Sequence, residues 1–267
     1  MTEALDDILL VESHERVATV TLNRPHRRNA LSRALYRRIP EALRELDADA
    51  AVDVIILTGC DPAFCAGVDL KELGDAPPAD ASGGGRSEWR GPLPPLSKPV
   101  IGAINGVAVT GGLELALACD FLVASERAAF ADTHARVGIM PGDGLTVRLA
   151  EAVGVRRAKE MSITGNFVPA KKAYELGLVN HVVAHEELLP FCTQLAADIL
   201  SNDQAGGRQM LDLYDQVTDT TAHEGWEIED RVSRAWEGAG YDTEEVARRR
   251  QGIVDRGQQQ RRRSIES

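Results

Sequence analysis

The chain has 267 residues, which is enough for one domain with a sizeable core, or for one core with an appendage. Its formal net charge of −11 argues against nucleic acid as a general partner. No segment is long and apolar enough to suggest a membrane span, so we expect no membrane partner.

The cysteines and the acidic first residues indicate in which cellular compartment the protein functions. The four cysteines show neither the spacing of zinc ligands nor the density of a disulfide framework, which favours a reducing environment without a structural metal (Cys60, Cys65, Cys119 and Cys192). The first residues lack a secretory or transit pattern. We therefore expect a cytoplasmic protein.

Short strands alternate with helices up to about Val183, the pattern of an α/β core. Residues 17–22 alternate between apolar and polar and predict a strand, and residues 31–49 carry apolar residues at helical spacing. The sequence shows no internal repeat. After Pro190 it predicts helices, the last running from about Glu224 to Arg263.

A first glycine turn follows the apolar run at 53–59. In the segment Asp61-Pro-Ala-Phe-Cys-Ala-Gly-Val-Asp-Leu70, Gly67 allows a tight turn that points the next N–H, on Val68, inward. The alternative is an ordinary turn in which Asp69 caps the following helix. Cys65 beside this turn is either a nucleophile or a small buried filler.

A second glycine turn lies between a predicted strand at 100–104 and a predicted helix at 113–118. Gly111 and Gly112 open that helix and leave backbone N–H groups that suit a negatively charged oxygen. Glu114 stands in the first turn, beside these donors. A capping role for Glu114 is the simpler alternative, but two strand–glycine–donor units in one chain favour a site that stabilises an oxyanion or enolate.

These two segments resemble the signature blocks of the enoyl-CoA hydratase/isomerase (crotonase) superfamily. Further agreement in order and spacing comes from residues 18–31, 130–142 and 173–180, so the resemblance covers roughly residues 8–200. It implies a ββα superhelix, a CoA thioester substrate and an oxyanion hole made by the N–H groups of Val68 and Gly111. No cofactor is implied, because coenzyme A enters as part of the substrate.

The resemblance also implies where the substrate binds and how the chain assembles. Substrate-binding residues fall at the two matched loops and the second turn (Arg28, Ala30, Ala66, Val68, Asp69, Leu70, Lys71 and Gly111). The arginines at 24, 27 and 28 and at 261–263 are either solvated surface or contacts to the CoA phosphates. Residues 1–200 would form the core and 201–267 a helical region that makes a homotrimer or a dimer of trimers, since Trp226, Ile228, Val232 and Trp236 need a partner surface.

The second catalytic segment departs from the hydratase pattern. Hydratases of the family use two glutamates, and His134 stands at the position of the second. An imidazole titrates near neutral pH and can give or take a proton. If the segment is extended, Asp132 lies on the same face and can orient His134 and favour its protonated form. Alternatively, His134 is a satisfied core histidine and Glu114 acts alone. The remaining histidines are expected at the surface.

The sequence therefore predicts an enoyl-CoA hydratase with Glu114 as base and His134, oriented by Asp132, as second acid or base. Another crotonase-type reaction, namely isomerisation, decarboxylation or hydrolysis, is the alternative among enzymes. A CoA-thioester-binding protein with little turnover is the alternative outside them. Residues 74–87, rich in Gly, Pro, Ser and Asp, form either a lid over the acyl group or a plain surface loop.

Overall fold

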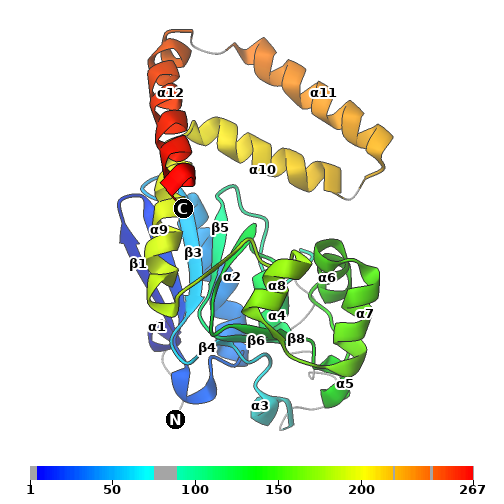
Figure 1. The fold of residues 1–267 in the computed structure, drawn as a ribbon. Helices are drawn as coiled ribbons and strands as arrows, with labels where there is room; N and C mark the ends of the chain where they lie inside the picture. Colours follow the sequence, from blue (N-terminus) through cyan, green and yellow to red (C-terminus); the bar gives the residue numbers. More distant parts are fainter. Residues whose placement is uncertain (1–4, 75–88, 219, 241–242, 267) are drawn as a thin grey trace. The chain divides into compact units, whose positions relative to one another are not determined.

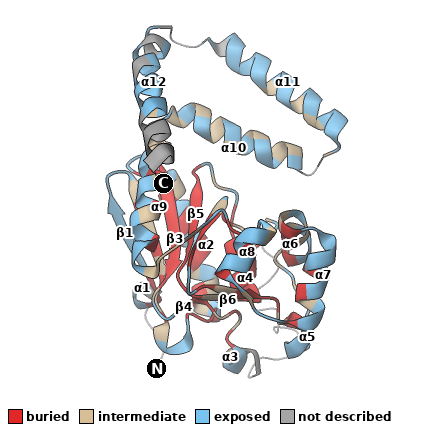
Figure 2. Cartoon of the chain, viewed as in Figure 1, coloured by how far each residue is buried: buried red, intermediate tan, exposed pale blue. Residues whose placement is uncertain are grey.

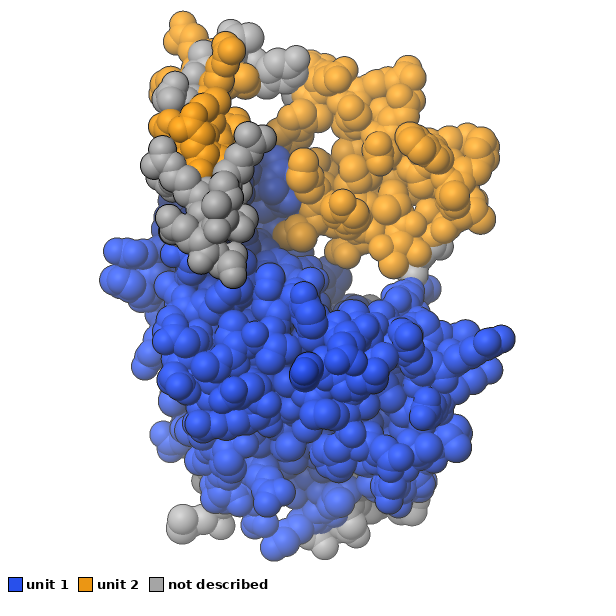
Figure 3. All heavy atoms as spheres, viewed as in Figure 1, with its two compact units in different colours: residues 1–208 blue, residues 209–267 orange. Residues whose placement is uncertain are grey.

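The computed structural model describes residues 5–74, 89–218, 220–240 and 243–266. It divides into two compact units, residues 1–208 and residues 209–267 (Figure 3). The first unit ends at Arg208, whose guanidinium donates a 2.7 Å hydrogen bond to the buried carboxylate of Asp53. This ion pair holds the last residue of the first unit to the core.

The strands are β1 (Leu9–His14), β2 (Val17–Leu22), β3 (Val54–Gly59), β4 (Ala63–Cys65), β5 (Val100–Ile104), β6 (Val107–Val109), β7 (Phe121–Ser125), β8 (Ala129–Ala131), β9 (Val168–Pro169) and β10 (His181–Val183). The helices of the first unit are α1 (Leu5–Ile8), α2 (Arg33–Ala48), α3 (Leu70–Gly74), α4 (Gly111–Leu117), α5 (His134–Val137), α6 (Leu145–Val153), α7 (Val155–Thr164), α8 (Ala170–Leu176) and α9 (Leu188–Leu200), with 3-10 turns η1 (Pro25–Arg27) and η3 (His185–Glu187). The others are α10 (Gln204–Thr218), α11 (Ala222–Ala239) and α12 (Thr243–Glu266).

The strands form two sheets (Figure 1). The larger has the order β1-β2-β3-β5-β7-β10, antiparallel between β1 and β2 and parallel from β2 onward. The smaller has the order β4-β6-β8-β9, in which β4, β6 and β8 are parallel. β3 is buried along its whole length, as is usual for a parallel strand covered on both faces.

Both sheets are built from a repeated ββα unit. β3, β5 and β7 each enter the larger sheet, the following strand (β4, β6 or β8) enters the smaller sheet, and a helix follows. The carboxyl ends of β4, β6 and β8 therefore lie at one edge of the small sheet, since the strands are parallel. Each of the two predicted glycine turns and the segment with His134 follows one of these three strands.

The main core lies between the sheets and α2 (Figure 2). Leu35, Ile39 and Leu43 point into it at intervals of four residues, one face of a helix. The hydroxyl of Ser32 accepts a 3.1 Å hydrogen bond from the Leu35 N–H and so caps the first turn. The helix predicted over 31–49 is thus confirmed, with its start two residues later.

The C-terminal helices correct one expectation. The helix predicted from Glu224 to Arg263 is two helices, because α11 ends at Ala239 and the next residue, Gly240, has a φ of 74°. None of the described residues after 208 is buried, and Trp226 is 72% exposed. No helix in the described ranges has the length and apolarity needed to cross a bilayer.

Gly112 allows α4 to approach β4 closely. A Cβ on Gly112 would overlap the carbonyl oxygen of Cys65 and would lie 2.8 Å from its carbonyl carbon. These are backbone neighbours, which cannot move aside like the end of a long side chain. Glycine at this position therefore sets the distance between the two turns that follow β4 and β6.

We expect Gly112→Ala to lower the free energy of unfolding by about 1–3 kcal/mol, as overpacking a core does. The measurement is urea denaturation followed by circular dichroism. Gly207→Ala is the matched control, because Gly207 lies in α10 and no atom lies within 4 Å of its added Cβ. Equal stability of Gly112→Ala and wild type would show that the close approach is not required.

Candidate active site

Backbone hydrogen bonds join the loop after β2 to the loop after β4. The Ala66 N–H donates to the Arg28 carbonyl at 3.0 Å, and the Leu31 N–H donates to the Gly67 carbonyl at 2.7 Å. The Asp69 N–H in turn donates to the Leu31 carbonyl at 3.0 Å. The structure thus brings together most of the predicted substrate-binding residues from two parts of the chain.

A buried ion pair between Arg24 and Asp69 also links these two loops. Both terminal nitrogens of Arg24 lie 3.1 Å from Asp69 Oδ2, and Arg24 also donates to the Ala30 carbonyl. Arg24 is only 5% exposed, so the expectation that it belongs to a surface patch with Arg27 and Arg28 is wrong. The carboxylate of Asp69 positions the loop by binding Arg24.

The turn before α4 brings Gly111 close to Val68, since a Cβ on Gly111 would lie 3.8 Å from the Val68 backbone nitrogen. Thr110 has a φ of 51°, which is strained for a residue with a branched side chain. Gly67 packs directly against it, since a Cβ there would lie 2.7 Å from the Val109 carbonyl oxygen. In the part of the chain that the structure describes, neither the Val68 nor the Gly111 N–H donates a hydrogen bond. Both remain available to a ligand.

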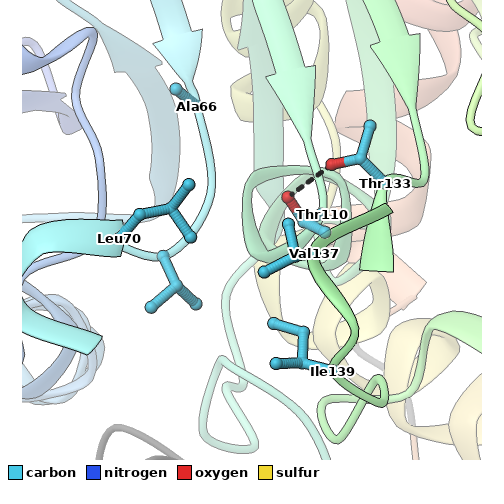
Figure 4. Close-up of a pocket in the computed structure, with 7 residues that line it drawn as sticks. Ala66, Leu70, Thr110, Thr133, Val137 and Ile139 are labelled. Carbon is cyan, nitrogen blue, oxygen red and sulfur yellow. Dashed lines mark hydrogen bonds between the residues drawn. The ribbon is translucent and has the colours of Figure 1, made fainter. Parts of the chain in front are cut away.

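A pocket opens beside these two turns (Figure 4). Its lining is apolar apart from Thr110 and Thr133, whose hydroxyl oxygens lie 3.5 Å apart (Ala66, Val68, Leu70, Val137 and Ile139 complete it). In Figure 4, Ala66 lies on the loop after β4 and Leu70 at the start of α3, opposite Val137 and Ile139. An apolar pocket with a few polar groups suits an acyl chain attached to a polar head.

Glu114, His134 and Asp132 form a buried chain of ionisable groups. Glu114 Oε2 lies 3.6 Å from His134 Nε2, and His134 Nδ1 lies 2.6 Å from Asp132 Oδ1. All three residues are at most 5% exposed. The contact of Asp132 with His134, expected if the segment is extended, forms instead at the start of α5, where the His134 backbone N–H also donates to Asp132 Oδ1 at 3.1 Å.

The neighbours of His134 favour its charged form. Burial alone would lower the pKa of His134, but the hydrogen bonds to Asp132 and Glu114 and their negative charges outweigh it and raise that pKa to about 9. Burial acts to raise the pKa of Asp132, yet hydrogen bonds from His134 and Ser162 hold it below its ordinary value. His134 is therefore an imidazolium at neutral pH.

Two residues that contact the site were not predicted from the sequence. The backbone N–H of Asp143 donates to Glu114 Oε1 at 2.9 Å, and the Tyr36 hydroxyl lies 3.0 and 2.9 Å from the two carboxylate oxygens of Asp143. Asp143 follows Pro141-Gly142 in the matched segment, which was the available signal. Nothing in the pattern of α2 distinguishes Tyr36.

The remaining predicted residues differ in how far they are exposed. Arg28 and Lys71 are exposed, and the side chains of residues 261–263 lie outside the described ones, as does the segment 75–88. Burial raises the pKa of the Cys65 thiol to about 12, which fits a buried filler and not a nucleophile. His185 is partly buried, with its side chain 17% exposed, and its ring nitrogens lie 3.0 Å from Ser125 Oγ and 3.0 Å from Asp61 Oδ2.

Within the described ranges, no group of three or more His, Cys, Asp or Glu side chains is arranged to hold a metal ion. The site itself offers three kinds of protein group. These are two free N–H donors, a carboxylate, and an imidazolium held by a second carboxylate.

Comparisons with known proteins agree on one family. The sequence pattern of the enoyl-CoA hydratase/isomerase family matches residues 12–248. A probable enoyl-CoA hydratase of Rhizobium meliloti is 38% identical over 231 residues, covering 85% of this chain and 88% of the relative. A crotonyl-CoA hydratase of Syntrophomonas wolfei is 37% identical over 204 residues, covering 75% and 78%. The crystal structure of an enoyl-CoA hydratase from Mycobacterium tuberculosis H37Rv aligns with a TM-score of 0.73 at 50% identity, covering 85% of this chain and 98% of that one.

We expect Asp132→Asn to lower the pKa of His134 by at least about one unit, because it removes the negative charge and keeps the shape. The measurement is NMR titration of protein labelled in its histidine rings, with the exposed His14 as internal control. An unchanged titration midpoint for His134 would contradict the electrostatic role of Asp132.

Proposed function

Because this chain belongs to the enoyl-CoA hydratase/isomerase family, we propose how its own residues perform the hydratase reaction. The chain is an enoyl-CoA hydratase, which adds water across the 2,3 double bond of a 2-enoyl-CoA thioester. The observation that carries the proposed roles is the contact between Glu114 and His134, beside two N–H groups that have no partner among the described residues.

The thioester carbonyl oxygen would accept hydrogen bonds from the N–H groups of Val68 and Gly111. Negative charge grows on this oxygen when water attacks C3 and an enolate forms. Donors that are already fixed in place stabilise this charge without having to reorient, and this is commonly the largest contribution to catalysis of this kind. The acyl chain would occupy the pocket between Leu70 and Ile139.

Glu114 and His134 would divide the two proton transfers. The Glu114 carboxylate takes one proton from water while the oxygen bonds to C3 of the substrate. The His134 imidazolium gives its proton to C2, and the enolate returns to the thioester. The proton on Glu114 then passes to His134 across the 3.6 Å contact. Each cycle adds one hydrogen and one hydroxyl and leaves the enzyme unchanged.

Histidine in place of a second glutamate is compatible with this division. The acid that protonates C2 must hold its proton at neutral pH. A glutamic acid does so only if its pKa is raised by several units, whereas the pKa of about 9 for His134 makes the imidazolium a donor directly. Asp132 holds Nδ1, so Nε2 is the nitrogen that faces Glu114 and the substrate.

The proposal includes the setting of the enzyme. The reaction needs no cofactor beyond the coenzyme A of the substrate, and Arg28 at the surface would contact its phosphates. We place the enzyme in the cytoplasm as a homotrimer or dimer of trimers. The exposed apolar side chains of α10 and α11 support association, because such side chains gain from burial (Met210, Tyr214, Trp226 and Trp236).

The direct test is to incubate the protein with crotonyl-CoA and longer 2-enoyl-CoAs and to follow the loss of the conjugated thioester absorbance. We expect turnover with formation of the 3-hydroxyacyl-CoA. Release of free coenzyme A, a shifted double bond or loss of CO₂ from a carboxylated substrate would instead identify another crotonase-type reaction. Tight binding of the thioester without any product would identify a binding protein.

We expect Glu114→Gln to lower hydratase turnover by roughly two to four orders of magnitude, because it removes the proton acceptor and preserves the shape. His134→Ala should lower turnover less, and His134→Glu should keep or raise it by restoring the two-carboxylate pattern. The assay is the one above, at saturating crotonyl-CoA. Full activity of Glu114→Gln, with His134→Ala inactive, would reverse the proposed roles.

We expect sedimentation velocity at micromolar concentration to give a trimer or hexamer. Replacing Trp226 and Trp236 by Gln should shift the population toward smaller species, because it removes large apolar side chains that are exposed in the single chain. A wild-type monomer at that concentration would contradict the proposed assembly.

A further inference from the structure

Tyr36 and Asp143 form a contact between distant parts of the chain, beside the site but outside the reaction described above. Tyr36 lies in the first half of α2, and Asp143 lies in the loop between α5 and α6. The Tyr36 hydroxyl donates to the Asp143 carboxylate, with distances of 3.0 and 2.9 Å to its two oxygens. The tyrosine ring also packs against the main core, so α2 offers a fixed anchor.

The loop that carries Asp143 has little rigidity of its own. Gly142 and Gly144 flank Asp143, and Gly144 has a φ of 92°. A Cβ on Gly142 would meet no atom within 4 Å, so the chain is not packed at that point. Glycines leave the backbone free to take many conformations. The hydrogen bond from Tyr36 therefore restricts the loop where its own sequence does not.

A backbone N–H of this loop orients the Glu114 carboxylate. The Asp143 N–H donates to Glu114 Oε1 at 2.9 Å. With Oε1 fixed in this way, Oε2 is the oxygen that lies 3.6 Å from His134 Nε2. Rotation of the carboxylate would break both relations, so the position of Asp143 N–H determines the geometry of the proposed base.

The Asp143 carboxylate lies close to the Glu114 carboxylate, and the negative charges of the two groups repel each other. Burial and the negative charge of Glu114 both raise the pKa of Asp143, while the hydrogen bond from Tyr36 and the charge of His134 act to lower it. Burial and Asp143 together keep the pKa of Tyr36 far above its ordinary value. Tyr36 is therefore a neutral donor throughout the working range, and it stabilises a carboxylate that a second carboxylate repels.

We infer that Tyr36 and Asp143 are positioning residues for the proposed base: the bond between their side chains fixes the Asp143 N–H, and that N–H orients Glu114. The inference rests on the proposed function, in which Glu114 accepts a proton from water. It assigns a catalytic consequence to a residue of α2 that does not touch the substrate.

Three variants separate the bond from the charge. Tyr36→Phe removes the donor, Asp143→Ala removes the acceptor, and Asp143→Asn keeps an acceptor oxygen but removes the charge. Tyr174→Phe is the matched control, because Tyr174 lies exposed on α8. Each variant is measured as the full-length protein for kcat and KM with crotonyl-CoA, and for hydrogen–deuterium exchange of residues 139–145 without substrate.

We expect Tyr36→Phe and Asp143→Ala each to lower kcat about tenfold with KM nearly unchanged, because the base is misoriented and substrate contacts remain. Both should speed amide exchange in 139–145. The double variant should be no worse than about either single one, because both remove one bond. Asp143→Asn should retain most of kcat, and Tyr174→Phe all of it.

The inference is overturned if Tyr36→Phe has wild-type kcat or wild-type exchange in 139–145, if the two losses multiply in the double variant, or if Asp143→Asn falls as far as Asp143→Ala. Failure of the proposed function looks different. The wild-type protein would then turn over no enoyl-CoA, while faster exchange in Tyr36→Phe would still establish that the bond holds the loop.

Discussion

The close approach of α4 to β4 is the constraint on which the site depends. Gly112 has no room for a side chain because the Cys65 backbone lies against it. This contact brings the turns after β4 and β6 together, so that two amides from positions 43 residues apart, Val68 and Gly111, can serve one oxygen. Because β4, β6 and β8 are parallel, the next turn in the series adds His134 at the same edge. Each ββα unit thus contributes one part of the site.

Where the turns meet, the carboxylates of Glu114 and Asp132 are buried. Buried charges need partners, and this explains the network of ionisable groups. Glu114 and Asp132 would be costly to bury as isolated carboxylates. The His134 imidazolium between them compensates part of that cost and takes a raised pKa in return. In the neighbouring loop, the ion pair with Arg24 offsets part of the cost of burying Asp69. The proton that stabilises the folded site is, in the proposed mechanism, the proton delivered to the substrate.

Much of this could be predicted from the sequence, and the reasons are specific. The strands at 17–22 and 100–104 are rich in β-branched residues or alternate cleanly, and the structure confirms both. The predicted crotonase-like α/β fold, the family and the hydratase function are confirmed by the relatives and solved structures. Glu114 stood out because it follows a glycine pair at a helix start.

The rest depended on contacts between distant residues. Tyr36 meets Asp143 across more than a hundred residues, and Asp143 acts on Glu114 through a backbone N–H that has no sequence signature. In the sequence, nothing distinguishes Arg24 from the exposed Arg27 and Arg28, because its partner Asp69 lies 45 residues away along the chain. The expected pairing of Asp132 with His134 rested on an extended segment, whereas the contact arises at the start of α5.

The central claim is that the His134 imidazolium is the acid that protonates C2, and the pH dependence of kcat/KM for crotonyl-CoA hydration tests it most directly. This quantity reports the ionisation of the free enzyme. Because the pKa of His134 is raised to about 9, the donor is present at neutral pH and is lost as the pH rises through that value. The account predicts a rate that is level near neutrality and falls above about pH 9. A rate that stays level or rises well beyond pH 9, in a protein that remains folded, would contradict it.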